Sequence, residues 1–127
     1  MQHPMMLHTT GEGQSRKFHV SIGNDTMTLD GKGVDDLIEL LAYFRSSMLP
    51  RVPAELNLGD RYHITVDPCW YVELNPLMKA TIVFLRHVGL GWTGFALPEP
   101  DFNHWLSQLR VAVEEIEEGA MKEARKW

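Results

Sequence analysis

The sequence predicts an α+β fold: an antiparallel β-sheet of four to five strands with two α-helices packed on one face, in the order ββα-β(β)-ββ-α. Three observations predict it. Residues 80–97 form an apolar run that reverses at Gly89-Leu90-Gly91, which is typical of a long β-hairpin. Shorter segments with alternating apolar and polar residues precede this run, and residues 33–48 and 101–118 carry apolar side chains at helical spacing.

The sequence of the first half of the chain predicts a flexible tail, a short hairpin and a helix. Residues 1–17 show no helical or strand period and contain Gly11, Gly13, Gln14, Ser15, Arg16 and Lys17, which predicts a flexible N-terminal tail. Alternation over residues 18–22 and 27–29, around a turn at Gly23-Asn24-Asp25, predicts a short hairpin. A helix over 33–48 follows, and the prolines after it end it.

The second half predicts a third strand before the long hairpin and a helix after it. Tyr62, Ile64 and Val66 alternate with polar residues, which favours a strand with one dry face. A proline-broken turn then carries two large aromatic residues, and residues 70–74 are open to pairing as a further strand. We therefore expect one domain over 18–119, with 120–127 as a short C-terminal tail or a helix extension.

Both faces of the long hairpin are apolar. If Val88 lies opposite Trp92 and Leu85 opposite Phe95, one face carries Val83, Leu85, Phe95 and Leu97. Helices can cover that face, but the other needs a segment of the chain, a second copy or a partner. The predicted interaction surface consists of Ile82, Phe84, Arg86 and Trp92 from the hairpin, with Trp70 and Tyr71 from the turn.

Composition limits the classes of partner. The 127 residues carry a net charge of -5, which disfavours binding to nucleic acid through phosphates. No apolar run reaches the roughly 18 residues of a membrane-spanning helix, and the N-terminus does not resemble a signal peptide. Because Cys69 is the only cysteine, no disulfide forms within the chain. We expect a cytoplasmic protein that does not enter membranes.

Chemistry-bearing residues are sparse. Four residues could assemble a polar site if the third strand lies beside the hairpin: His63, Asp67, Cys69 and His87. Their spacing lacks the paired ligands typical of zinc sites, so surface histidines and a buried structural cysteine are the simpler interpretation. We predict no metal, no cofactor and no catalytic residue, and no small-molecule substrate is identifiable.

The sequence therefore favours a non-enzymatic binding or assembly module, acting as a homodimer or with a protein partner through an apolar sheet face. One alternative is a nucleic-acid-binding sheet that uses Trp92, Arg86, Lys79 and Trp70. Another is a small enzyme that uses Cys69 and a histidine, with no reaction indicated.

Overall fold

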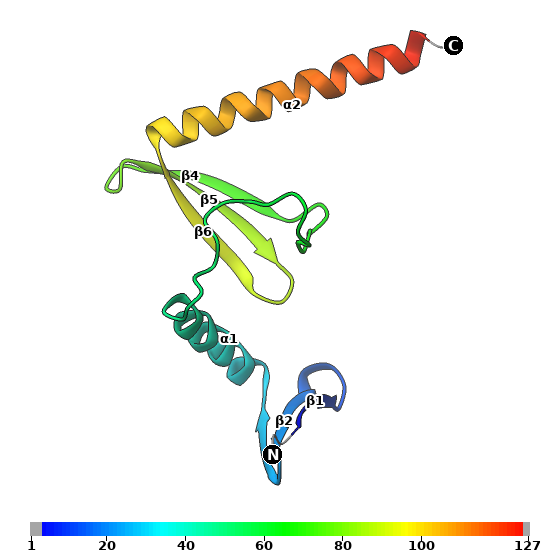
Figure 1. Ribbon diagram of the computed structural model, residues 1–127, viewed down its shortest axis with the longest axis vertical. Coiled ribbons are helices and arrows are strands. Elements are labelled where there is room, and N and C mark those ends of the chain that lie inside the picture. Colours follow the sequence, from blue (N-terminus) through cyan, green and yellow to red (C-terminus); the bar gives the residue numbers. More distant parts are fainter. Residues whose placement is uncertain (1–3, 126–127) are drawn as a thin grey trace. The chain divides into compact units, whose positions relative to one another are not determined.

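The computed structural model describes residues 4–125 and divides into two compact units, Met1–Tyr62 and His63–Trp127. Each unit consists of three antiparallel strands followed by one helix (Figure 1). The predicted α+β class with antiparallel pairing is confirmed. The prediction of a single sheet with both helices on one face is wrong, because the strands form two separate three-stranded sheets.

The first sheet contains a strand that the sequence analysis placed in the N-terminal tail. Strands β1 (Met5–Thr10), β2 (Lys17–Ile22) and β3 (Asp25–Leu29) pair in that order. The glycines read as signs of a loose tail instead reverse the chain between β1 and β2. Gly11 has a φ of 81°, and a Cβ there would lie 2.8 Å from the Ser15 carbonyl oxygen, so the turn requires glycine.

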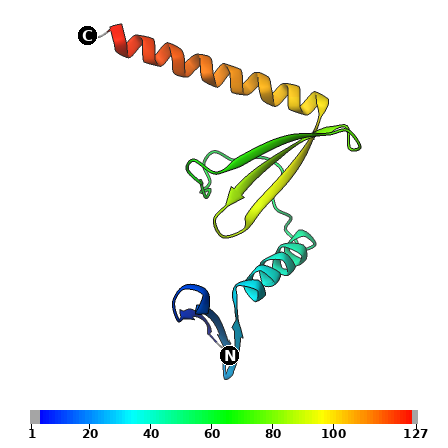
Figure 2. The ribbon, with the colours of Figure 1, turned by 180° about the vertical axis from the view of Figure 1, so that it is seen from behind.

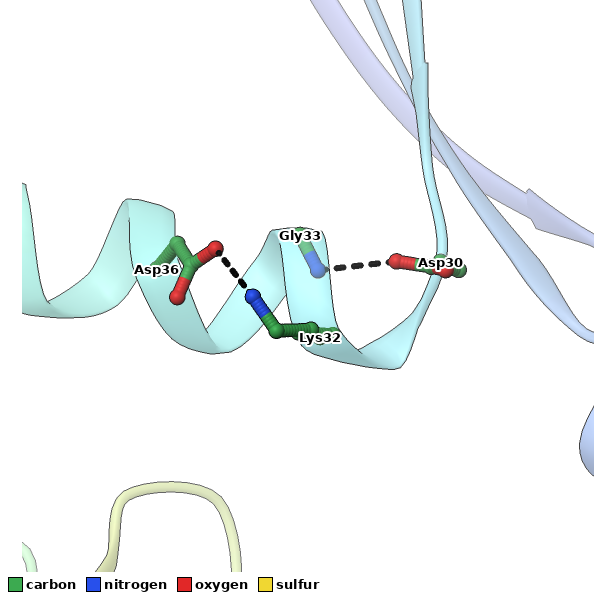
Figure 3. Close-up of polar contacts among 4 residues, drawn as sticks. All are labelled: Asp30, Lys32, Gly33 and Asp36. Carbon is green, nitrogen blue, oxygen red and sulfur yellow. Dashed lines mark hydrogen bonds and ion pairs between the residues drawn. The ribbon is translucent and has the colours of Figure 1, made fainter.

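Helix α1 (Gly31–Ser46) begins two residues before the predicted start. Asp30 caps it, because its Oδ1 accepts a hydrogen bond of 2.8 Å from the Gly33 backbone N–H (Figure 3). An exposed ion pair of 3.4 Å joins Lys32 Nζ to Asp36 one turn further on. Val34 is half-buried in the first half of the helix, whereas Phe44 near its end is 56% exposed.

The predicted third strand, over residues 61–66, is wrong. Residues 61–65 have no regular secondary structure. The Tyr62 hydroxyl folds back onto Asn57, donating to its carbonyl at 2.8 Å and accepting from its N–H at 2.9 Å. Ile64 and Val66 are 84% and 86% exposed. The segment therefore belongs to neither sheet and forms part of the connection between α1 and the next strand.

The second sheet contains the long hairpin. Strands β4 (Trp70–Asn75), β5 (Ala80–His87) and β6 (Gly91–Pro98) pair in that order, so residues 70–74 do form a strand. The predicted hairpin register is wrong by two residues: Arg86, and not Val88, lies opposite Trp92. Because side chains alternate with a period of two, this shift leaves every hairpin residue on its predicted face.

Helix α2 (Glu99–Arg125) is longer at both ends than the predicted 101–118, and Gly119 does not end it. Gly119 does not have the positive φ of a glycine C-cap, so the helix continues through it. The helix packs against β5 and β6 near its own start, and in both views its C-terminal half extends beyond the strands (Figures 1 and 2).

Very little of the chain is buried. Among the described residues the buried apolar side chains are Ala80 and Val83, both on β5. The chain exposes 12003 Å², whereas two separate compact units of half its mass would together expose roughly 8000 Å². Each unit therefore presents apolar surface that its own elements do not cover.

Candidate association surface

One face of the second sheet carries most of the residues predicted to form the interaction surface. Cross-strand pairing places Tyr71 opposite Phe84, and Arg86 opposite Trp92, all with side chains on the same side of the sheet. Ile82 lies on this side as well, one position along from Phe84 on the same face of β5. We call these five residues the aromatic face.

Gly94 shapes the centre of the aromatic face. It lies opposite Phe84, and a Cβ there would be 2.8 Å from Phe84 Cε1 and 3.4 Å from Ile82 Cγ2. The missing side chain leaves room for the Phe84 ring to lie across β6. On the other side of Phe84, the ring of Tyr71 is tilted by 40° with its centroid 6.2 Å away. Phe84 is thereby half-buried by its own sheet.

Arg86 and Trp92 are direct cross-strand neighbours, closer in register than the diagonal pair that the sequence predicted. Both are exposed, Trp92 at 53%. No cation–π contact joins them within residues 4–125. Arg86 is instead fixed through its backbone, whose N–H donates to the Cys69 carbonyl at 3.0 Å. The end of the hairpin thus presents a cation and an indole side by side to solvent.

Trp70 lies on the opposite face from the rest of the predicted surface. It pairs with Leu85, and the next pairs on that side are Val72 with Val83 and Leu74 with Thr81. Because strand residues alternate between faces, two adjacent aromatic residues cannot share one. The six predicted interaction residues are therefore divided, five on the aromatic face and Trp70 on the other.

The face that carries Trp70 is the more aliphatic of the two. With the first turns of α2 it encloses an open groove of about 360 Å³, and we call this side of the sheet the groove face. Five side chains line the groove: Val83, Leu85, Phe95, Leu97 and Trp105. Trp105 alone comes from α2, and Phe95 remains 54% exposed. The helix thus covers one end of this face and leaves the rest open.

The sequence analysis missed a second exposed apolar surface, on helix α2. Its apolar residues recur at alternating intervals of four and three, which is the heptad spacing of a helix that packs against another helix. The residues of this stripe are Phe102, Leu106, Leu109, Val113, Ile116 and Ala120. The sequence analysis expected the apolar side of this helix to pack on the sheet, but in both views the helix diverges from the strands toward its C-terminal end (Figures 1 and 2). The sequence showed the spacing of these residues, but it could not show that the stripe is exposed.

No hydrogen bond or ion pair joins any two of the four residues of the predicted polar site, all of which lie in the described part of the chain. His87 Nδ1 accepts hydrogen bonds of 3.0 Å from the backbone N–H groups of Gly89 and Leu90, which makes His87 a structural part of the hairpin turn. Cys69 is exposed, not the buried residue that we expected. Within residues 4–125, no three His, Cys, Asp or Glu side chains converge as a metal site would require.

The residues proposed for nucleic-acid binding are also dispersed. Lys79 lies in the turn before β5, whereas Arg86 lies near the far end of that strand, roughly 20 Å away at the rise of an extended chain. Trp70 faces the other way from Arg86 and Trp92. A continuous stacking surface flanked by cations is therefore not formed by these four residues.

Comparisons with known proteins give no functional information: no family model matches the chain, and neither a curated protein nor a solved structure is detectably similar to it. In the part of the chain that the structure describes, neither helix combines the length and apolar character that spanning a bilayer requires.

Proposed function

We propose that this protein is a non-enzymatic assembly module whose copies associate through the apolar surface of the β4-β5-β6 sheet. One observation carries the proposal: both faces of this sheet expose large apolar side chains, and within residues 4–123 only Ala80 and Val83 are buried. Soluble monomers rarely expose contiguous apolar patches of more than a few hundred Å². An antiparallel sheet facing water on one side normally carries polar residues there.

The size of the exposed surface suits a second copy. A stable interface buries roughly 800 Å² on each partner, and single aromatic side chains bring about 150 to 250 Å² each. Trp70, Tyr71, Trp92 and Phe95 are all more than half exposed on this one sheet. Tyr71 and Trp92 belong to the aromatic face, and Trp70 and Phe95 to the groove face, so each face offers two large aromatic anchors to a second copy.

Charge on the aromatic face also suits pairing with an identical surface. Arg86 lies at one end of that face, and Glu73 lies on the same face beside Ile82. In a two-fold contact both copies use the same patch, so a residue at one end of the patch lies near the opposite end of the patch on the other copy. Arg86 of one copy can then approach Glu73 of the other, so self-association does not oppose like charges.

Sedimentation velocity over a range of protein concentrations tests the proposal. We expect a concentration-dependent dimer that persists in high salt, because burial of apolar surface drives it. The variants W92S and F95S each remove a large exposed side chain, from the aromatic face and the groove face respectively. The face that forms the interface is identified by the variant that weakens the dimer. A wild-type chain that stays monomeric at high micromolar concentration would contradict the proposal.

A further inference from the structure

We propose that two copies of this chain pair through helix α2 in antiparallel orientation, centred near Val111, so that the second copy covers the stripe and borders the groove face. The inference rests on the proposed function, since it assumes that copies associate, and it goes beyond it by adding helix α2 as a contact distinct from the sheet surface.

The heptad spacing of the stripe is the first observation. Phe102, Leu109 and Ile116 repeat every seven residues, and so do Leu106, Val113 and Ala120. A strict repeat of seven keeps apolar residues on a seam that faces another helix along its whole length. A helix that packs only on a sheet at its start gains nothing from continuing that repeat over the 19 residues from Phe102 to Ala120.

The exposure of the stripe is the second observation. Phe102 and Leu106 are half-buried, whereas Leu109, Val113 and Ile116 are 47%, 53% and 71% exposed. The exposure of these side chains therefore rises along the helix, and the helix moves away from the strands in the same direction (Figure 2). The described residues of the unit His63–Trp127 therefore leave the stripe beyond Leu109 exposed. A second α2 helix carries the same seven-residue repeat and can pack against it.

Side-chain sizes favour an antiparallel alignment centred on residue 111. That alignment gives six layers, each apolar: Phe102 opposite Ala120 of the second copy, Leu106 opposite Ile116, Leu109 opposite Val113, and the three symmetric equivalents. The largest seam residue thus meets the smallest. Beside the seam, Trp105 faces Gly119 of the second copy, again large against small. Moving the alignment by one heptad would place Glu123 opposite Leu106.

Charge distribution favours the same orientation. Four glutamates, Glu114, Glu115, Glu117 and Glu118, occupy one stretch of α2, and a parallel in-register pair would bring this stretch against its own copy. The antiparallel pair separates the two stretches. It places Arg110 near Glu117 of the second copy, at the flanking positions where interhelical ion pairs set orientation. Neither residue has an ion pair or hydrogen bond through its side chain within the described chain.

The antiparallel arrangement also accounts for the open groove. With the centre at residue 111, the C-terminal half of one α2 runs beside the N-terminal half of the other, where Trp105 and the groove face lie. Ile116 of the second copy lies level with Leu106 in this alignment. Its side chain and its neighbours can then enter the groove of about 360 Å³ that Trp105 leaves open.

A matched pair of substitutions tests whether the stripe is an interface. V113D places a carboxylate in the seam, while V111D makes the same change on the other side of the helix, where Val111 is 47% exposed. We expect V113D to raise the dimer Kd at least about a hundredfold, because a buried unpaired charge is costly. V111D should leave it within about threefold of wild type. Circular dichroism of both variants shows whether the helix is retained.

Pulsed electron paramagnetic resonance on the wild-type seam tests the orientation without disturbing the interface. Single spin labels are placed at His104, Val111 and Glu118 in a Cys69→Ser background; the three positions are seven residues apart and all exposed. An antiparallel pair gives the shortest distance at 111, and an axial separation about 20 Å greater at both 104 and 118. A parallel pair gives equal distances at all three positions.

The outcomes separate this inference from the proposed function. Equal spin-label distances would refute the antiparallel orientation. A V113D variant that remains folded and dimerises as wild type would refute helix pairing while leaving sheet-mediated association intact. A wild-type chain that is monomeric at every concentration would overturn both.

Discussion

The two units share one element order, three antiparallel strands and then a helix, but they treat the faces of their sheets differently. In the first unit one face is polar: His19 bonds Thr10 at 2.7 Å and Thr28 at 3.0 Å, and Ser21 bonds Thr26 at 3.0 Å. The second unit has no such ladder among its described residues, and both of its faces are apolar. A sheet with one polar face has one apolar face to bury, whereas a sheet with two apolar faces has both to bury.

The helix of the second unit also exposes more apolar surface than the helix of the first. Helix α1 has 16 residues and α2 has 27, although the two sheets have the same number of strands. Each helix packs its early turns on its own sheet and leaves later apolar residues exposed. The excess is greater in α2, and its apolar residues follow a regular seam. The second unit therefore exposes more apolar surface that is available for association than the first unit does.

The largest expected effect on stability is at Gly94, the residue that shapes the aromatic face. Gly94→Ala places a Cβ 2.8 Å from Phe84 Cε1, and overpacking of this kind costs about 1 to 3 kcal/mol. Gly31→Ala in the first unit is the control, since a Cβ there meets nothing within 4 Å. Urea denaturation at a fixed protein concentration measures both. Equal stability of the two variants would show that Phe84 moves aside freely.

Two central-strand valines compare the cores of the units directly. Val83 is 5% exposed on β5, whereas Val20 on β2 is only half-buried. Truncation to alanine should cost about 2 kcal/mol at Val83 and about 1 kcal/mol at Val20, because the cost follows the apolar area lost from a covered site. The same denaturation experiment distinguishes them. A larger loss at Val20 would reverse the comparison of the two cores.

The smallest expected effect is at the start of α1, where Asp30 caps the helix. Asp30→Ala removes the acceptor of the 2.8 Å bond from Gly33 and should cost about 1 kcal/mol, while Asp30→Ser, which can also cap, should cost a few tenths. Hydrogen exchange at the amides of the first turn of α1 measures the change locally. If the two variants exchange alike, the cap contributes little.

Prediction from sequence succeeded where local pattern decides structure. Alternation and turn residues identified the first hairpin, and the 80–97 hairpin was assigned to the correct faces although its register was wrong by two residues. Helix α1 was located to within two residues. Prediction failed where the structure depends on pairing with another strand. Residues Met5–Thr10 form a strand because they pair with β2. Ile64 and Val66 remain exposed and form no strand, because no other strand pairs with them.

The candidate surface divides in the same way. Ile82, Phe84, Arg86, Trp92 and Tyr71 share a face, as period-two alternation and cross-strand pairing require, and the same alternation sends Trp70 to the other side. His63, Asp67, Cys69 and His87 could not be tested by spacing alone. The sequence predicted neither the absence of the third strand nor the two hydrogen bonds, from the backbone N–H groups of Gly89 and Leu90, that hold His87 in the hairpin turn.

The sequence by itself determined which residues can share a face or a seam, because periods of 2, 3.5 and 3.6 are fixed by backbone geometry. It therefore determined that the 80–97 hairpin is apolar on both sides and that α2 carries a heptad stripe. Only the tertiary structure decided how much of that surface is covered. Coverage depends on which strands find partners and how far a helix runs past its sheet, and those depend on contacts between residues remote in the chain.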